Sequence, residues 1–139
     1  MKIINAENLI LGRMAAFVAK KAILGETVEV INCEKAVMTG NKKEIFARYK
    51  TKREMGQVYH GPYILRNPDR FVKRAIRGML PYKQPKGKAA FERITCHKGV
   101  PEELKDKESQ TIEKADIAKT ASFKYITVAD ICKSMGAKQ

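Results

Sequence analysis

The 139-residue chain has no tryptophan, two histidines and three cysteines. The cysteines, Cys33, Cys96 and Cys132, are far apart and form no C-x-x-C pair. An odd number at such spacings is typical neither of a disulfide framework nor of a zinc site. We therefore expect reduced thiols and no metal centre. Because Cys33 and Cys132 lie in apolar patterns, we expect both in the core.

The motifs of common enzyme sites are also absent. The chain contains no G-x-G-x-x-G, G-x-x-x-x-G-K-[ST], H-E-x-x-H or G-x-S-x-G sequence. His97 follows Cys96, but neighbouring residues of a strand point to opposite faces, so the two do not form a catalytic pair. We expect no enzymatic activity, no cofactor and no small-molecule substrate.

Long apolar runs are missing too. Residues 1–5 lack the basic and apolar regions of a signal peptide, and 31% of all residues are charged. No long amphipathic helix with an aromatic insertion face is evident. We expect a cytoplasmic protein without a membrane partner, and a single domain, 1–139, with one core.

Acidic residues are in short supply: 15 Asp and Glu oppose 28 Lys and Arg, which gives a net charge of +13. Residues 41–100 carry 16 basic and 4 acidic side chains, whereas residues 1–40 carry 5 and 4, and the tail, 101–139, carries 7 and 7. An excess confined to one segment indicates a contact surface. We predict that residues 41–100 face a polyanion, in the first place a nucleic acid.

The first 33 residues predict a βαβ unit. Residues 2–5 are typical of a short strand, apolar residues recur at helical spacing over 11–22, and residues 27–33 are rich in β-branched side chains. Strands joined by such a crossover are parallel and need helices on at least one face. The pattern therefore predicts an α/β fold.

A basic helix and a long irregular segment follow. Asn41 and Glu44 predict a cap for a helix that extends to about Arg53. The backbone N–H groups of residues 39–43 could also hold a phosphate, an alternative that is compatible with a plain cap. Residues 54–67 show no period, and such long segments are usually functional or disordered.

The most informative pattern lies in a helix predicted to open at residues 67–69, where Asn-Pro-Asp is typical of a helix start. Its apolar stripe consists of Phe71, Val72, Ala75, Ile76 and Met79. Its basic stripe consists of Arg70, Lys73, Arg74 and Arg77. Like charges at these spacings destabilise a helix by about 0.2–0.5 kcal/mol per pair, so we expect a partner's phosphates to compensate.

The remaining elements are shorter. We expect a helix over about 88–93 and a strand over 95–97. Residues 100–122 are polar and charge-balanced, which predicts a surface excursion with at most one helix and no second core. A strand over 123–127 and a final helix, opened by the capping box that starts at Thr127, dock the chain end on the domain.

Aromatic rings accompany the cations. They belong to Tyr49, Tyr59, His60, Tyr63 and Tyr82. Such rings stack on unpaired bases in RNA-binding proteins. Because Tyr49 follows an apolar residue by one helical turn, we expect it to pack inward, whereas Tyr59 and His60 are the better candidates for stacking.

Short sequences in the first 101 residues point to a family. They are LGR at 11–13, VINCE at 30–34, GPY at 61–63, RNP at 66–68, RGMLP at 77–81, KGKAA at 86–90 and GVP at 99–101. In this order and spacing the chain closely resembles the universal large-subunit ribosomal protein family number thirteen, in its archaeal form. The C-terminal third resembles the family less specifically.

The resemblance implies a three-layer α/β/α domain with a small, mostly parallel central sheet. It also implies a cytoplasmic, ribosomal location and a structural, non-enzymatic role in the large subunit, with rRNA binding, neighbouring ribosomal proteins as partners and participation in early assembly. With rRNA as the partner, the candidate contacts are Arg13, Lys42, Lys43, Arg48, Lys52, Arg53, Tyr59, His60, Arg66, Arg70, Lys73, Arg74, Arg77, Lys83, Lys86 and Lys88.

Other functions remain open on the residues alone. An RNA-modifying α/β enzyme, or a component of another RNA complex, would also need a basic surface, but the enzyme requires a cofactor pocket at the end of its sheet. A DNA-compacting protein would bind duplex DNA and structured rRNA with equal affinity.

Overall fold

The computed structural model of the protein describes residues 1–121 and 123–137. Residues 122 and 138–139, which belong to the predicted tail, lie outside the described residues. Within the described ranges, no helix is long and apolar enough to cross a membrane.

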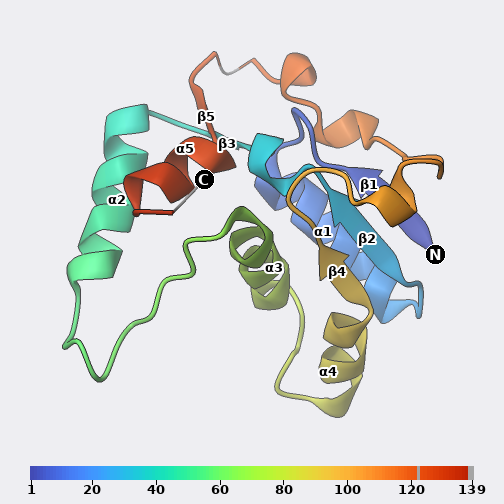
Figure 1. Ribbon diagram of the computed structural model, residues 1–139, viewed down its shortest axis with the longest axis horizontal. Coiled ribbons are helices and arrows are strands. Elements are labelled where there is room, and N and C mark those ends of the chain that lie inside the picture. The colour runs from blue at the N-terminus through green and yellow to red at the C-terminus, as the bar shows by residue number, and fades with distance from the viewer. Residues whose placement is uncertain (122, 138–139) are drawn as a thin grey trace.

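A three-stranded parallel sheet lies in the half of the molecule that carries the N-terminus (Figure 1). Its strands are β1 (Lys2–Asn5), β2 (Val28–Ile31) and β4 (Ile94–Cys96), in the order β1-β2-β4. Both strand pairs are parallel, as the βαβ pattern predicts.

The crossover between β1 and β2 is helix α1 (Leu11–Ile23). Its buried face includes Met14, Ala15 and Val18, the residues whose spacing predicts the helix. The helix stops before Gly25, whose φ of 98° is easily reached only without a side chain. The predicted βαβ unit is therefore confirmed.

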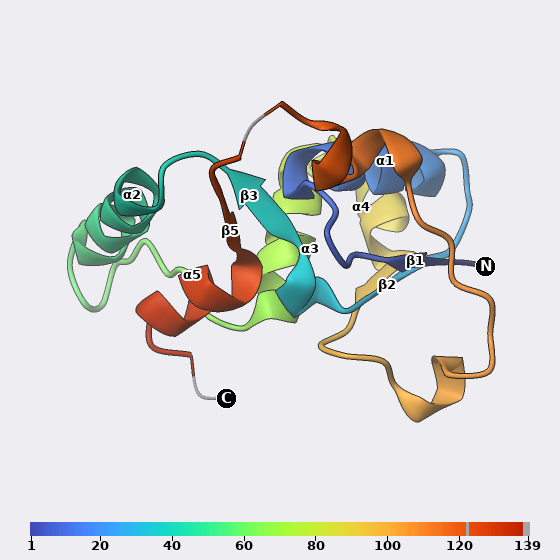
Figure 2. The same cartoon turned by 90° about the horizontal axis from the view of Figure 1, so that it is seen from above.

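Two further helices pack against α1, namely α3 (Pro68–Gly78) and α4 (Pro85–Glu92). Figure 2 shows α1 and α4 on one side of β1 and β2. Ile4 and Val30, on the covered face of the sheet, are almost fully buried in the main core. The α/β class with a small, mostly parallel sheet is confirmed.

The opposite face of the sheet is covered by the tail. Leu104, from the short 3₁₀ helix η2 (Glu102–Leu104), packs with Ile3 and Ile31 in a small apolar cluster. The backbone of Gln110 bonds to β1 in both directions, donating to Ile3 O at 2.8 Å and accepting from Asn5 N–H at 3.0 Å. The polar segment over residues 100–122 was expected to form no second core. It contributes Leu104 to this small cluster.

A second group of elements lies at one end of the molecule (Figure 1). Strands β3 (Val37–Thr39) and β5 (Tyr125–Thr127) pair in antiparallel fashion, and α5 (Val128–Ser134) follows directly. The Thr127 hydroxyl oxygen accepts a hydrogen bond from the Asp130 N–H at 3.2 Å, which confirms the cap. Through α5 the chain end docks on the main core, as expected.

Helix α2 (Lys42–Glu54) packs on α5, and an irregular segment, residues 55–67, joins it to α3 (Figure 1). The Asn41 side chain accepts a hydrogen bond from the Lys43 N–H at 3.3 Å, so the predicted cap is confirmed. Only Ile45 of this helix is buried, which leaves most of its surface to solvent.

Three local predictions were wrong. The helix expected over 88–93 begins at Pro85, because proline suits the first position of a helix. The strand expected over 27–33 stops at Ile31, because Asn32 has a left-handed backbone, with φ of 56°. Met79 is 44% exposed, since α3 ends at Gly78 and Leu80 turns into the core instead.

Between residues 100 and 121 the described chain forms short 3₁₀ helices and no α-helix. Besides η2 these are η3 (Glu113–Ala115) and η4 (Ile117–Lys119). Ala115 is fully buried, and its carbonyl accepts a hydrogen bond from the Ile10 N–H at 2.7 Å. Backbone hydrogen bonds to β1, and to Ile10 just before α1, therefore hold this segment in place without an α-helix.

Candidate nucleic-acid interface

Helix α3 separates an apolar face from a basic one, as its sequence predicts. Phe71, Val72 and Ile76 are buried, and Ile76 has no exposed surface. Pro68 occupies the first turn, although the side chain of Asn67 makes no capping hydrogen bond. Burial of the apolar face fixes the direction in which the cations point.

The basic stripe of α3 divides into two kinds of side chain. Arg70 and Arg74 are exposed, and neither has an ion pair or hydrogen bond within the described part of the chain. Lys73 Nζ lies 4.9 Å from the Phe91 ring centroid, and Arg77 Cζ lies 4.7 Å from that of Tyr82. These half-buried cations make intramolecular cation–π contacts. Arg70 and Arg74 are thus the members most available to a partner.

The turn that carries Tyr82 is held by close packing against α4. Gly87 is buried, and a Cβ at this position would collide with the carbonyl group of Pro81. Glycine is therefore required for α4 to approach this turn. The exposed cations of this region, all predicted contacts, are Lys83, Lys86 and Lys88.

Helix α2 presents the densest group of cations. Lys42, Lys43 and Arg48 are exposed on it, and so is Lys50, which the sequence prediction omitted. Lys50 forms a long contact of 4.0 Å with Glu54, and an exposed pair of this kind contributes little to stability. The helix therefore offers a basic surface with few internal partners.

Two cations in the last turn of α2 are engaged within the chain. Arg53 donates a hydrogen bond from Nη1 to the Met135 carbonyl oxygen at 3.2 Å. Lys52 Nζ lies 5.5 Å from the Tyr49 ring centroid. Arg66 reaches the same region as Arg53, because its Nη1 would be 3.6 Å from a Cβ at Gly136. Arg53 thus helps to hold the end of α5 as well as contributing charge.

The irregular segment exposes aromatic rings. The N–H groups of His60 and Gly61 donate to the Gln57 carbonyl, which closes a tight loop with Tyr59 88% exposed at its tip. The Tyr63 hydroxyl donates to the Tyr59 carbonyl oxygen at 2.7 Å. His60 is exposed beside Tyr59. The rings predicted to stack on bases are therefore accessible.

A cleft brings several predicted residues together. It measures about 660 Å³ and lies between α2, residues 62–65 and α3. Its charged and aromatic lining consists of Tyr49, Lys52, Tyr63, Phe71, Arg74 and Arg77. Tyr49 is half-buried, with its ring centroid 5.4 Å from that of Phe71, and burial raises the pKa of its phenol. The inward packing predicted for Tyr49 is confirmed.

Arg13 is directed to the tail. From the exposed surface of α1 it donates hydrogen bonds to the Lys114 carbonyl oxygen and the Thr120 hydroxyl, both at 3.3 Å. These long contacts fasten the tail to α1. The structure does not bring Arg13 together with the residues of the cleft.

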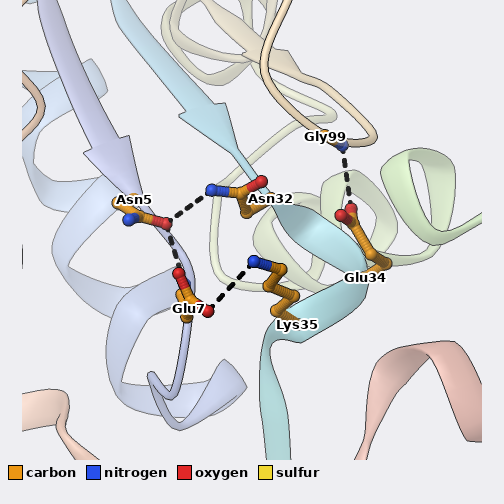
Figure 3. Close-up of polar contacts among 6 residues, drawn as sticks. All are labelled: Asn5, Glu7, Asn32, Glu34, Lys35 and Gly99. Atoms are coloured by element: carbon orange, nitrogen blue, oxygen red, sulfur yellow. Dashed lines mark hydrogen bonds and ion pairs between the residues drawn. The ribbon is translucent and has the colours of Figure 1, made fainter.

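The edge of the sheet where an α/β enzyme binds its cofactor is occupied by internal polar contacts (Figure 3). Asn5 Oδ1 accepts hydrogen bonds from the Asn32 amide at 3.0 Å and from the Glu7 N–H at 3.1 Å. Lys35 pairs with Glu7 at 3.0 Å, and Glu34 accepts from the Gly99 N–H at 3.0 Å. The side chains of Asn5 and Asn32, and those of Glu7 and Lys35, therefore satisfy one another at this edge.

The cysteines fit a structural role. Cys33 and Cys132 are buried and Cys96 is half-buried, all as free thiols. The Cys96 thiol and then burial raise the pKa of Cys33, and burial raises the pKa of Cys132 to about 11. In the ranges 1–121 and 123–137, no three metal-ligating side chains gather at one place.

Comparison with known proteins gives a consistent match. The family described as "Ribosomal protein L13" matches residues 1–103 of the chain. The chain belongs to this ribosomal protein family. It is 45% identical to "Large ribosomal subunit protein uL13" of Methanosarcina barkeri and 43% identical to that of Methanococcoides burtonii, with 99% of each chain covered. The L13 protein of Archaeoglobus fulgidus is 43% identical over 96% of this chain and 86% of its own length.

Two sequence-based predictions are confirmed by these matches. The L13 family is the one whose short sequences the chain resembles, and the relatives named here are archaeal. Members are named as ribosomal proteins, in agreement with a non-enzymatic protein. The archaeal relatives also align with the tail, which resembles the family less specifically.

In this L13-family chain the structure brings four of these short sequences into contact in two pairs. RGMLP and KGKAA meet where Gly87 packs against Pro81, and VINCE and GVP meet through Glu34 and Gly99. Sequence reasoning missed these contacts, and it missed the cleft. Gly87 lies before the helix predicted over 88–93, so no local pattern indicated its close approach to Pro81.

Proposed function

We propose that this chain is a structural constituent of the large ribosomal subunit that binds rRNA through a basic surface on α2, residues 55–67, α3 and the start of α4. The observation that carries the proposal is the free basic face of α3. Arg70 and Arg74 are held outward by a buried apolar face and lack internal partners among the described residues. Arginine in this setting suits two-pronged contacts to phosphate.

The surface combines the two features that RNA recognition uses. Cations on two helices can neutralise phosphates, and the exposed rings of Tyr59 and Tyr63 can stack on unpaired bases. Family membership supports the cytoplasmic, ribosomal location that the sequence predicts. The remaining predicted contacts, on α2 and at Lys83, Lys86 and Lys88, extend the same charge.

The proposal includes early assembly and protein neighbours. A charge-balanced tail is the part of the proposed single domain, 1–139, best suited to neighbouring large-subunit proteins. It carries Phe123, which is 95% exposed.

If the chain acts early, its depletion leads to accumulation of a large-subunit precursor, whereas a late role leaves nearly complete particles.

Sedimentation of cell extract tests the main proposal. The wild-type chain should sediment with large subunits at physiological salt, and a variant with Arg70→Gln and Arg74→Gln should incorporate less. A variant with Lys105→Gln and Lys107→Gln makes the same change of net charge in the tail and should incorporate normally. Recovery of the wild-type chain mainly in ribosome-free fractions would sink the proposal.

Binding measurements separate this function from its alternatives. On structured rRNA, the slope of log affinity against log salt should flatten by roughly 0.7–0.9 for each phosphate contact removed. A DNA-compacting protein would instead bind duplex DNA as tightly as rRNA. An RNA-modifying enzyme would instead bind a nucleotide or S-adenosylmethionine.

A further inference from the structure

We propose that the cleft between α2, residues 62–65 and α3 holds one unpaired nucleotide of the bound RNA. The inference rests on the proposed rRNA binding and adds the chemistry of one contact. With a volume of about 660 Å³, the cleft lies within the range of about 300–1,000 Å³ that small-molecule sites occupy. A duplex is too wide to enter it, so its occupant is a nucleotide turned out of the helical stack.

The aromatic lining favours a base. Tyr63 is 74% exposed, and its hydroxyl is already bonded to the Tyr59 carbonyl oxygen, which fixes the ring and leaves a face free. Tyr49, on the other wall, already packs on Phe71 and carries Lys52 over its ring. Tyr63 is therefore the ring that stacks on the base.

The polar lining favours a phosphate and a base edge. Arg74 lines the cleft as an exposed cation without an internal partner in the described chain. Arg77 also lines it, and the Nε–H of Arg77 is buried without a hydrogen-bond partner in residues 1–121 and 123–137. A buried donor without an acceptor is unfavourable, and an oxygen or ring nitrogen of a nucleotide would supply one.

A protein neighbour is the other occupant to consider. An apolar side chain would fill the space beside Ile64 and Phe71, but it would leave Arg74 and the Arg77 Nε–H unpaired. A nucleotide provides an aromatic face for Tyr63 and acceptors for both arginines. The combined lining therefore favours RNA.

Ultraviolet crosslinking in intact large subunits tests the contact. Trypsin releases residues 54–66 as one peptide, which contains both Tyr59 and Tyr63. After nuclease digestion, a nucleotide adduct should be found on Tyr63.

Tyr63→Phe keeps the ring and should retain the adduct. Arg74→Gln should lower its yield about tenfold, the effect of one hydrogen bond to a charged group. Lys105→Gln, which removes one exposed positive charge from the tail outside the cleft, should not.

Each other outcome overturns the inference in a recognisable way. Subunits that contain the chain but give no adduct on Tyr63, or an adduct on Tyr59 alone, show that the cleft holds no base, and they leave the proposed function intact. A crosslink from Tyr63 to another protein assigns the cleft to a protein neighbour. A chain that does not enter subunits at all contradicts the proposed function itself.

Discussion

The guanidinium carbon of Arg77 lies 4.7 Å from the ring centroid of Tyr82, so the last cation of the basic stripe packs on the turn that follows its own helix. This turn packs against α4, where Gly87 lies close to the Pro81 carbonyl group. A residue that the sequence assigns to RNA contact therefore also belongs to the packing of the domain.

Replacing Gly87 by alanine should destabilise the fold. The added Cβ would overlap the backbone of residues 81–82, so α4 or the turn must shift. Gly12→Ala is the matched control, because a Cβ there meets no atom within 4 Å and alanine favours a helix by about 1 kcal/mol. Thermal unfolding should show a lower melting temperature for Gly87→Ala and an equal or higher one for Gly12→Ala. Equal effects would contradict the packing described here.

The cations of α3 should differ in their effect on stability. Arg74→Gln should leave the free energy of unfolding unchanged or raise it by a few tenths of a kcal/mol, because it relieves repulsion between like charges. Arg77→Gln should lower it by about 0.5–2 kcal/mol through loss of the contact with Tyr82. Ile76→Ala, in the fully buried face, should cost about 2–5 kcal/mol. Urea denaturation measures all three, and an Arg77→Gln variant as stable as Arg74→Gln would show that the ring contact contributes nothing.

Glu34→Ala should loosen the connection between β4 and the tail. The carboxylate accepts the Gly99 N–H at 3.0 Å, and a lost hydrogen bond to a charged group costs about 1–3 kcal/mol. Glu103→Ala removes an exposed carboxylate and should have little effect. Amide hydrogen exchange at Gly99 should become faster in Glu34→Ala alone, and unchanged protection would argue against this bond.

Alkaline pH should destabilise the protein through Cys132. Burial raises the pKa of this thiol from 9.0 to about 11 in the folded state. The unfolded chain therefore releases its proton first, and the free energy of unfolding should fall as pH rises from about 9 through about 11. Cys132→Ala has no proton to lose, so its decline over this range should be shallower. Parallel curves for the two proteins would exclude this contribution.

Local patterns were sufficient for much of the fold. The βαβ unit, the buried face of α3 and the cap at Thr127 follow from periods and caps that involve residues a few positions apart. The charge excess of residues 41–100 and the short sequences of the L13 family also lie in the linear sequence. The sequence by itself thus determined the fold class, the family and the basic surface.

Tertiary structure decided which cations are free. Lys73 and Arg77 have the same helical spacing as Arg70 and Arg74, but they pack on rings of Phe91 and Tyr82. That difference depends on where α4 and its preceding turn lie. The cleft likewise exists only because α2 and residues 62–65 fold back beside α3. Contacts between segments distant in sequence depend on the packing of the whole chain, and no local period encodes them.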